Sequence, residues 1–193
     1  MHDVEPAPNL PNRGRKTYAA LISYLGTHYS GWQIQAHEKG HDPSIQAVLE
    51  QSLEKMIGQR PHWQSSGRTD AGVHAIGQVA NFTIDWDAGS RGQKPEITVY
   101  HLHRGLNTIL PAAIRILELR EVAADFHSQV QATKKQYSYY VQTGRAPSAI
   151  HAPYSKFSRL PLDVAAMDRS IRYLLGEHDF KPFQGAGSKP LRS

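Results

Sequence analysis

Three stretches in the first two thirds of the chain have the apolar and polar pattern of strands. Lys16–Gly26 is rich in aromatic, branched and apolar residues and closes with a glycine, which is typical of a strand and the turn after it. Ala113–Val122 is predicted as another strand. Gly77–Trp86 alternates, so a strand there places four apolar side chains on one side: Ala80, Phe82, Ile84 and Trp86.

Apolar side chains at helical spacing predict a helix on either side of the Gly77–Trp86 strand. In the first helix, Asp42 is the predicted N-cap and Pro43 the first helical residue. Gly58 ends that helix, because glycine readily adopts the left-handed conformation of a C-cap. Its apolar positions are Ile45, Val48, Leu49, Met56 and Ile57. The second helix is predicted over Val99–Leu110 and is stopped by a proline.

A strand and a helix recur in the last third of the chain. Gln136–Gly144 is predicted as an aromatic strand, and Asp163 is predicted to cap a helix that ends at Gly176. The apolar face of this helix consists of Val164, Met167, Ile171, Leu174 and Leu175. Tyr18 in the first strand precedes Gly58 by nearly the same number of residues as Tyr137 precedes Gly176. Coincidence between two ordinary strand–helix units remains an alternative explanation of this spacing.

The repeated spacing predicts an α+β fold of two related units, each a mixed or antiparallel sheet with helices on one face. We expect a disordered tail over residues 1–14, an N-terminal unit over 15–122 and a C-terminal unit over 123–193. The first unit has strands after its helix, whereas the second has almost no chain left there. We therefore expect the second unit to be incomplete.

Composition narrows the classes of protein that this chain can belong to. The net charge of +5 favours a polyanionic partner such as nucleic acid. The chain has no cysteine, which excludes disulfides, thiolate metal sites and a cysteine nucleophile. No apolar run approaches the span of a bilayer, and the polar N-terminus lacks a signal sequence, so we expect a cytoplasmic protein. The histidines have no convincing metal-ligand spacing, and we predict no metal site.

The stretch "SSGRTDAGVHAIGQVANF" places opposite charges in a loop that leads directly into a strand. Arg68 and Asp70 lie two residues apart between Gly67 and Gly72. A carboxylate in such a loop can be partly buried and still be kept ionised by the arginine, which makes it a competent nucleophile or general base. Arg68 could instead bind a phosphate through its guanidinium group. An ordinary turn with a surface Arg–Asp pair is the alternative.

The longer string "GRTDAGVHA", followed by "GQVANF", resembles the signature of the TruA family of tRNA pseudouridine synthases. Further motifs follow the order of that family. They are "YLGTHYSGWQ", "SIQAVLEQSL", "LNTILP", "DFHSQVQATKKQYSYYV" and "LLGEHDFKPFQGAGS". On these motifs, which run from about Lys16 onward, the chain is identified as a member of the family.

The resemblance implies a tRNA pseudouridine synthase, an isomerase that converts uridine to pseudouridine in the anticodon stem-loop, at positions 38 to 40 in tRNA numbering. It implies no cofactor and a homodimer whose subunits each have two related α+β halves around a basic cleft. Asp70 matches the catalytic aspartate of the family. Arg68 matches the arginine that helps to hold the base out of the stack, and Tyr137 matches the tyrosine that packs on the uracil ring.

The chain departs from the family pattern at several positions. Leu25 stands where aspartate is usual, Ser128 where alanine is usual and Gln129 where arginine is usual. Family members continue past a segment like "GSKPLRS" to an arginine that pairs with the catalytic aspartate, and Arg192 matches an earlier basic position. A truncated RNA-binding relative with weak or no activity is therefore the alternative function. A basic structural or assembly protein is a more remote one.

Overall fold

The computed structural model describes residues 14–35, 42–87 and 97–183. Residues 1–13 of the predicted N-terminal tail and Arg192 lie outside these ranges, whereas Gly14, the last residue of that tail, lies within them. The chain divides into two compact units, Met1–Gln136 and Tyr137–Ser193, and each is described by itself. The predicted unit boundaries at residues 15, 122 and 123 remain predictions. Among the helices in the described ranges, none is long and apolar enough to cross a membrane.

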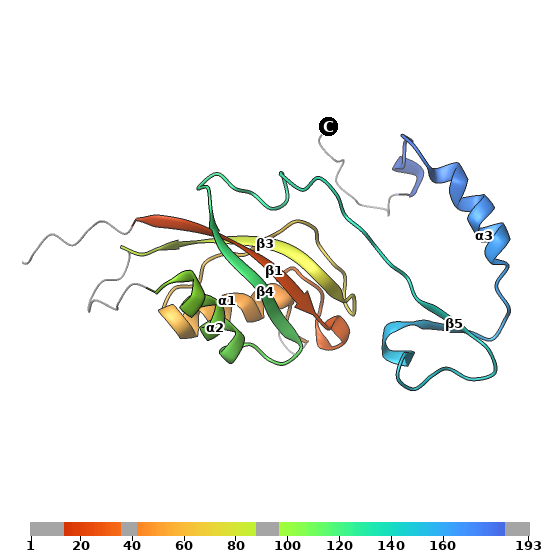
Figure 1. Cartoon of the computed structure of the whole chain (residues 1–193), viewed down its shortest axis with the longest axis horizontal. Coiled ribbons are helices and arrows are strands. Elements are labelled where there is room, and N and C mark those ends of the chain that lie inside the picture. The colour runs from red at the N-terminus through yellow and green to blue at the C-terminus, as the bar shows by residue number, and fades with distance from the viewer. Residues whose placement is uncertain (1–13, 36–41, 88–96, 184–193) are drawn as a thin grey trace, which may run out of the picture. The chain divides into compact units, whose positions relative to one another are not determined.

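The first unit contains a four-stranded antiparallel sheet in the order β2-β3-β1-β4 (Figure 1). Its strands are β1 (Arg15–Tyr24), β2 (Gln64–Ser65), β3 (Ala75–Asp85) and β4 (Ile114–Val122). The three strands predicted for this part of the chain are thus confirmed. The central strand β1 pairs with β3 on one side and β4 on the other, so it runs through the middle of the core.

Two helices, α1 (Ile45–Ile57) and α2 (Val99–Ile109), cover one face of this sheet (Figure 1). Alternate side chains of β1 are buried against them, as the period of a strand requires. The largest fully buried side chains of this core are Trp63, Tyr18, Tyr24, Phe82, Ile22, Ile45, Leu49, Leu53, Ile84, Leu102, Leu106 and Ile114. The predicted α+β class, with helices on one face of the sheet, is confirmed.

The start of α1 differs from the prediction. Ser44, not Asp42, is the N-cap, and its Oγ accepts a hydrogen bond of 3.2 Å from the N–H of Ala47. The first helical N–H groups are satisfied from outside the helix: Ile45 donates to the carbonyl of Gly31, and Gln46 donates to that of Trp32 (both 3.0 Å). This contact with a distant loop places the helix start two residues later than local sequence preference suggests. Gly58 ends the helix in the left-handed conformation (φ 79°), as predicted.

Over its described residues, 137–183, the second unit contains a short parallel strand pair and one α-helix. The predicted strand Gln136–Gly144 forms only as β5 (Val141–Thr143), which pairs with β6 (Lys156–Ser158). Helix α3 (Val164–Ile171) begins after Asp163, whose carboxylate accepts from the N–H of Ala166 (2.8 Å), as predicted. It ends five residues before Gly176 and continues as a 3-10 turn. Other 3-10 turns are Gly26–His28, Ala152–Tyr154 and Lys181–Phe183.

The strand and the helix of the second unit are shorter than predicted, for a physical reason. The aromatic alternation before β5 favours a strand only if a sheet pairs with it and buries one face. In the described part of the chain, β5 has one three-residue partner, and the side chains of Tyr137, Tyr139 and Tyr140 are exposed. No residue of α3 is buried. That the two units are related remains a prediction.

Candidate active site

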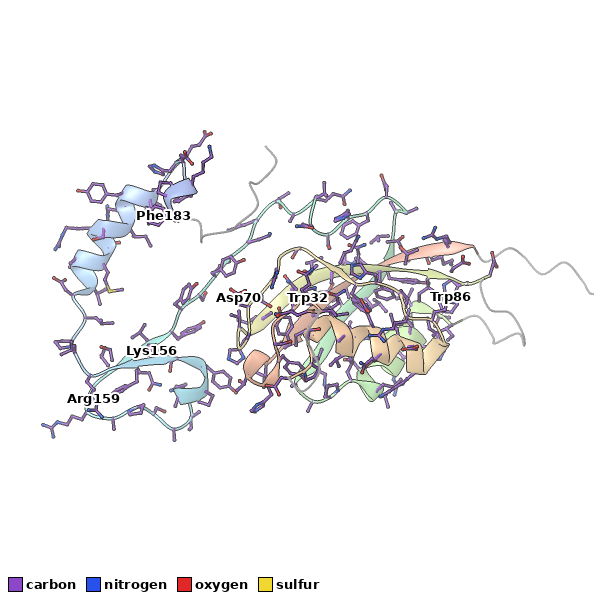
Figure 2. The ribbon with its side chains drawn as sticks, turned by 180° about the vertical axis from the view of Figure 1, so that it is seen from behind. Trp32, Asp70, Trp86, Lys156, Arg159 and Phe183 are labelled. Atoms are coloured by element: carbon purple, nitrogen blue, oxygen red, sulfur yellow. The ribbon has the colours of Figure 1, made fainter. Side chains whose placement is uncertain are left out.

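The charged loop of residues 66–74 connects β2 to β3 at one end of the sheet. Its position follows from the strand register, because Tyr24 at the end of β1 pairs with Ala75 at the start of β3. Figure 2 shows Asp70 and Trp86 at opposite ends of the first unit. The loop therefore lies next to the segment that follows β1, which includes the 3-10 turn Gly26–His28.

Main-chain hydrogen bonds hold this loop on both sides of Asp70. The N–H of Trp32 donates to the carbonyl of Thr69 (2.9 Å), and the N–H of Gly72 donates to the carbonyl of Tyr29 (3.3 Å). Within the loop, the N–H of Val73 donates to the carbonyl of Asp70 itself (3.2 Å). Because the restraints act on the backbone, they leave the Asp70 carboxylate free for chemistry.

Side chains of Tyr24 and His74 add to the restraint of the loop. The hydroxyl of Tyr24 shares a hydrogen bond of 2.8 Å with that of Thr69. Nδ1 of His74 accepts from the N–H of Gly26 (3.1 Å), so the neutral ring carries its proton on Nε2. His74, although part of the signature, thus binds backbone as a structural residue. Burial raises the pKa of the Tyr29 hydroxyl above its usual value of 10.0, and this side chain stays neutral at physiological pH.

Two glycines allow the segment after β1 to lie close to the charged loop of residues 66–74. A Cβ atom on Gly31 would lie 2.6 Å from the carbonyl oxygen of Thr69, and its φ of +101° also disfavours other residues. A Cβ on Gly26 would collide with the carbonyl of Val73. The motif "YLGTHYSGWQ" therefore contains its glycines at the positions where it contacts the charged loop. In the sequence, Gly26 was interpreted only as the close of a strand and Gly31 only as part of this motif.

Asp70 and Arg68 are both exposed. Neither side chain forms a hydrogen bond or ion pair with another described residue of the chain. The expectation of a partly buried Asp70 held by Arg68 is therefore wrong for the described residues. The physical reason is that the loop is held through the main chain of Thr69 and Gly72, so neither charge is needed for its structure. An unpaired carboxylate on a restrained loop is available to a ligand.

Tyr137 is the first residue of the second unit, and its side chain is 61% exposed. The exposed ring is free to stack on a planar ligand. Its predicted role beside Asp70 remains a prediction.

Two side chains of residues 123–136, the last segment of the first unit, contact its sheet and its charged loop. Ser128 is buried: its N–H donates to Oδ1 of Asn81, and its hydroxyl donates to the carbonyl of Gln64 (both 2.9 Å). Lys135 lies against Gly67 of the charged loop. From the sequence alone, Ser128 was noted only as a departure from a family pattern. The pair Lys134 and Lys135 was open to two interpretations, contact with phosphates or simple solvation. No local signal reveals either contact, because both join residues far apart in the chain.

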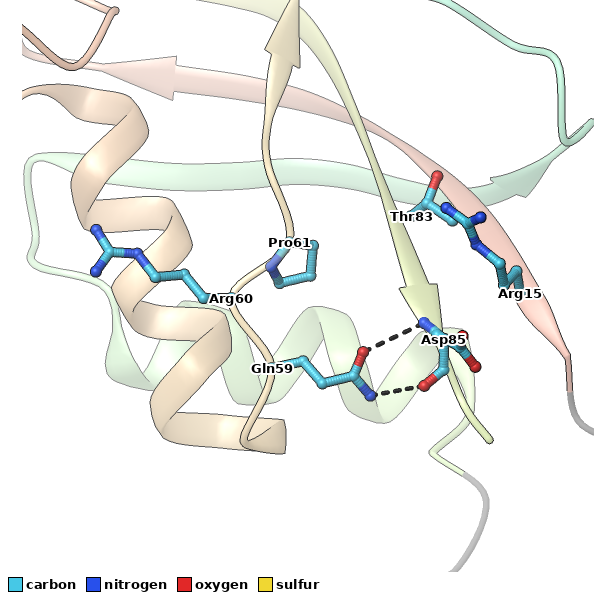
Figure 3. A pocket seen from close by; sticks show the side chains of 6 residues that line it. All are labelled: Arg15, Gln59, Arg60, Pro61, Thr83 and Asp85. Carbon is cyan, nitrogen blue, oxygen red and sulfur yellow. Dashed lines mark hydrogen bonds between the residues drawn. The ribbon is translucent and has the colours of Figure 1, made fainter. Parts of the chain in front are cut away.

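A separate hollow lies at the other end of the sheet, where β1 begins and β3 ends. It is lined by Arg15, Gln59, Arg60, Pro61, Thr83 and Asp85 (Figure 3). The amide of Gln59 donates to the carbonyl of Asp85 (2.7 Å) and accepts from its N–H (3.2 Å), which closes the edge of β3. The strand register separates this hollow from Asp70 by the length of β1, so it is not part of the candidate site. In the described ranges, no three acidic or histidine side chains gather as metal ligands.

Comparisons with known proteins match the region that contains this site. A family model described as tRNA pseudouridine synthase matches residues 20–129, more than half of the chain. A protein named tRNA pseudouridine synthase A from Moorella thermoacetica is 40% identical over 171 residues, which cover 89% of this chain and 65% of the relative. The protein of that name from Francisella philomiragia is 37% identical over 171 residues, covering 89% and 61%.

A third relative, tRNA pseudouridine synthase A from Nitratidesulfovibrio vulgaris, is 40% identical over 171 residues, which cover 86% of this chain and 54% of the relative. The chain thus spans between 54% and 65% of the length of these curated relatives. The matched region of the family model includes the whole loop of residues 66–74 and the segments that hold it. The chain belongs to the family of tRNA pseudouridine synthases.

Proposed function

We propose that this protein isomerises uridine to pseudouridine in the anticodon stem-loop of tRNA, at positions 38 to 40, with Asp70 as the nucleophile. The observation that carries the proposal is the state of Asp70: an exposed carboxylate, without a partner among the described residues, on a loop restrained on both sides. The loop lies within the part of the chain that the family model matches. Relatives of this chain have the name tRNA pseudouridine synthase A.

The proposed reaction needs no redox partner. The glycosidic bond between C1′ and N1 breaks and a bond between C1′ and C5 forms, while C5 loses a proton and N1 gains one. Product and substrate are isomers, so the atoms and electrons balance without a cofactor. The carboxylate of Asp70 starts the reaction as a nucleophile, at either the base or the ribose carbon. A carboxylate on a restrained loop enters this step without first having to be ordered.

The target base must leave its stack before Asp70 can reach it, at a cost of a few kcal/mol. In our proposal, Arg68 holds the extruded base out of the stack and Tyr137 packs on its ring. Both side chains are exposed and therefore free to contact RNA. The net charge of +5 suits a polyanionic substrate. We further propose that the protein acts in the cytoplasm as a homodimer.

Substitution of Asp70 tests the proposal. Asp70→Asn keeps the shape of the side chain but removes the nucleophile, so we expect pseudouridine formation to be abolished while tRNA affinity changes by less than about twofold. Pseudouridine in an anticodon-arm tRNA is measured after chemical labelling, and affinity is measured by filter binding. Asp125→Asn is the matched control, because Asp125 is another exposed aspartate of the same unit.

Substantial turnover by Asp70→Asn would remove Asp70 from the chemistry. If the unsubstituted protein bound tRNA but formed no pseudouridine, the RNA-binding alternative would replace the proposed reaction. Loss of activity in both Asp70→Asn and Asp125→Asn would point to a general loss of structure rather than of the nucleophile.

A further inference from the structure

The side chain of Lys135 lies against the backbone of Gly67 in the charged loop. A Cβ atom built on Gly67 would lie 3.2 Å from Nζ of this lysine, 3.3 Å from Cε and 3.5 Å from Cδ. The end of the lysine side chain thus lies directly beside the position that a side chain at residue 67 would take. Both residues belong to the first unit. The contact brings the ammonium to the residue directly before Arg68.

The backbone that Lys135 contacts is itself held in place. The carbonyl of Gly67 accepts a hydrogen bond from Oγ of Ser65 (3.1 Å) and another from the side-chain amide of Gln78. Oγ of Ser66 donates to the amide oxygen of Gln78 (3.0 Å). Lys135 therefore lies on a defined surface next to β3, although it is an exposed residue.

Two positively charged residues near this contact, Lys135 and Arg68, have no anionic partner among the described residues. Lys135 and Arg68 are both exposed cations, and neither forms an ion pair or hydrogen bond within the described ranges. Lys135 also forms no ion pair with Asp70, although both lie in the same unit. An ammonium gains little from a position close to another cation unless an anion lies between or beside them. Phosphate is the anion that an RNA substrate brings.

We propose that Lys135 is a substrate-positioning residue whose ammonium holds a backbone phosphate beside the nucleotide presented to Asp70. The inference rests on the proposed function and adds a residue to it. The compact charge of a lysine suits a single phosphate oxygen, and its long stem over Gly67 directs that charge to the loop that carries Asp70. Lys134, its neighbour, is also exposed and is not among the residues nearest to Gly67.

Lys135→Met removes the charge and keeps an unbranched apolar stem. We expect tRNA affinity at low salt to fall about five- to tenfold and the slope of log affinity against log salt to decrease by about one. Lys134→Met is the matched control and should change both quantities much less. Lys135→Arg keeps a cation and should restore most of the affinity. A purely structural role for the side chain would not change the salt slope.

Gly67→Ala gives a second test without removing the lysine. Gly67 does not have a positive φ, so alanine fits its backbone, but the new methyl group would make a tight contact with the end of the Lys135 side chain and shift its ammonium slightly. We expect Gly67→Ala to weaken tRNA binding about threefold or more in the unsubstituted protein. It should have no further effect in the Lys135→Met background, because the group it displaces is already gone.

Three outcomes would contradict the inference about Lys135, and one of them would also contradict the proposed function. If the unsubstituted protein binds tRNA but Lys135→Met and Lys134→Met behave alike, the inference about Lys135 is wrong and the proposed function stands. Additive effects of Gly67→Ala and Lys135→Met would also overturn it, since they would act independently. If the unsubstituted protein neither binds nor modifies tRNA, the proposed function fails, and the role of Lys135 fails with it. Equal unfolding midpoints for all variants confirm that folding is unchanged.

Discussion

At the scale of single residues, two glycines of similar conformation have different surroundings. Gly31 and Gly58 both have positive φ, at +101° and +79°. Around Gly58, at the end of α1, a Cβ would meet nothing within 4 Å, whereas at Gly31 it would meet the carbonyl oxygen of Thr69 at 2.6 Å. One glycine serves only the backbone conformation of a helix end. The other also allows the loop that carries Asp70 to lie against the segment after β1.

This difference predicts different effects of alanine at the two positions. Gly58→Ala should lower the free energy of unfolding by about 1–2 kcal/mol, the cost of a left-handed non-glycine residue, and should leave pseudouridine formation intact. Gly31→Ala adds a collision with a carbonyl that cannot move without the loop. We expect a larger loss, about 2–4 kcal/mol, together with loss of turnover. Urea unfolding and the pseudouridine assay measure both, and equal losses in the two variants would show that the contact with Thr69 has no effect.

At the scale of elements, the segment of residues 123–136 is attached to the sheet through one buried serine. Asn81 in β3 accepts from the N–H of Ser128 and donates from its amide to the side chain of Gln64 in β2 (3.3 Å). The hydroxyl of Ser128 donates to the carbonyl of Gln64. The short edge strand β2 and the segment that carries Lys135 are therefore held by the same small set of hydrogen bonds.

Ser128→Ala keeps the N–H bond to Asn81 and removes only the hydroxyl donor. We expect a loss of about 1 kcal/mol in the free energy of unfolding, because the carbonyl of Gln64 loses a partner. The amides of residues 126–131 should also exchange faster with solvent. Gln129→Ala, an exposed neighbour, is the control and should change stability by less than about 0.5 kcal/mol. Stability unchanged by Ser128→Ala would mean that the hydroxyl does not hold the segment.

At the scale of the whole molecule, the described core lies entirely in the first unit. Every buried residue of the described ranges lies between Thr17 and Ser128. In the second unit, Val164, Met167, Ile171, Leu174 and Leu175 are between 48% and 70% exposed. An isolated helix as short as α3 is marginal in water, because its stability normally comes from packing of an apolar face.

Hydrogen exchange should reveal this difference between the units. We expect the amides of α3 (Val164–Ile171) to exchange orders of magnitude faster than those of the central strand β1, whose opening requires disruption of the core. The measurement is native-state exchange on residues 1–193 without RNA, read by mass spectrometry. Protection of α3 as strong as that of β1 would contradict the expectation, and it would indicate that the apolar face of α3 is covered in solution.

Much of the first unit could be predicted from the sequence because its signals are local. The alternation in β3, the helical spacing and proline stop of α2, and the glycine at the end of α1 each act within a few residues of chain. The motif around Arg68 and Asp70, together with the further motifs in the order of the family, identified the family that the comparisons show. Asp163 as the cap of α3 is local in the same way, since a carboxylate satisfies the N–H three residues later.

Only the tertiary structure decided the features that join distant residues. The first turn of α1 begins after Ser44 because carbonyls of another loop satisfy its N–H groups. The aromatic run before β5 is not a strand because no described sheet pairs with it. Asp70 is exposed and unpaired among the described residues because main-chain contacts hold its loop. Local periodicity predicted most elements of the first unit, and the resemblance of several sequence motifs identified the family. Contacts across the chain determined how the candidate site is held and brought Lys135 to its edge.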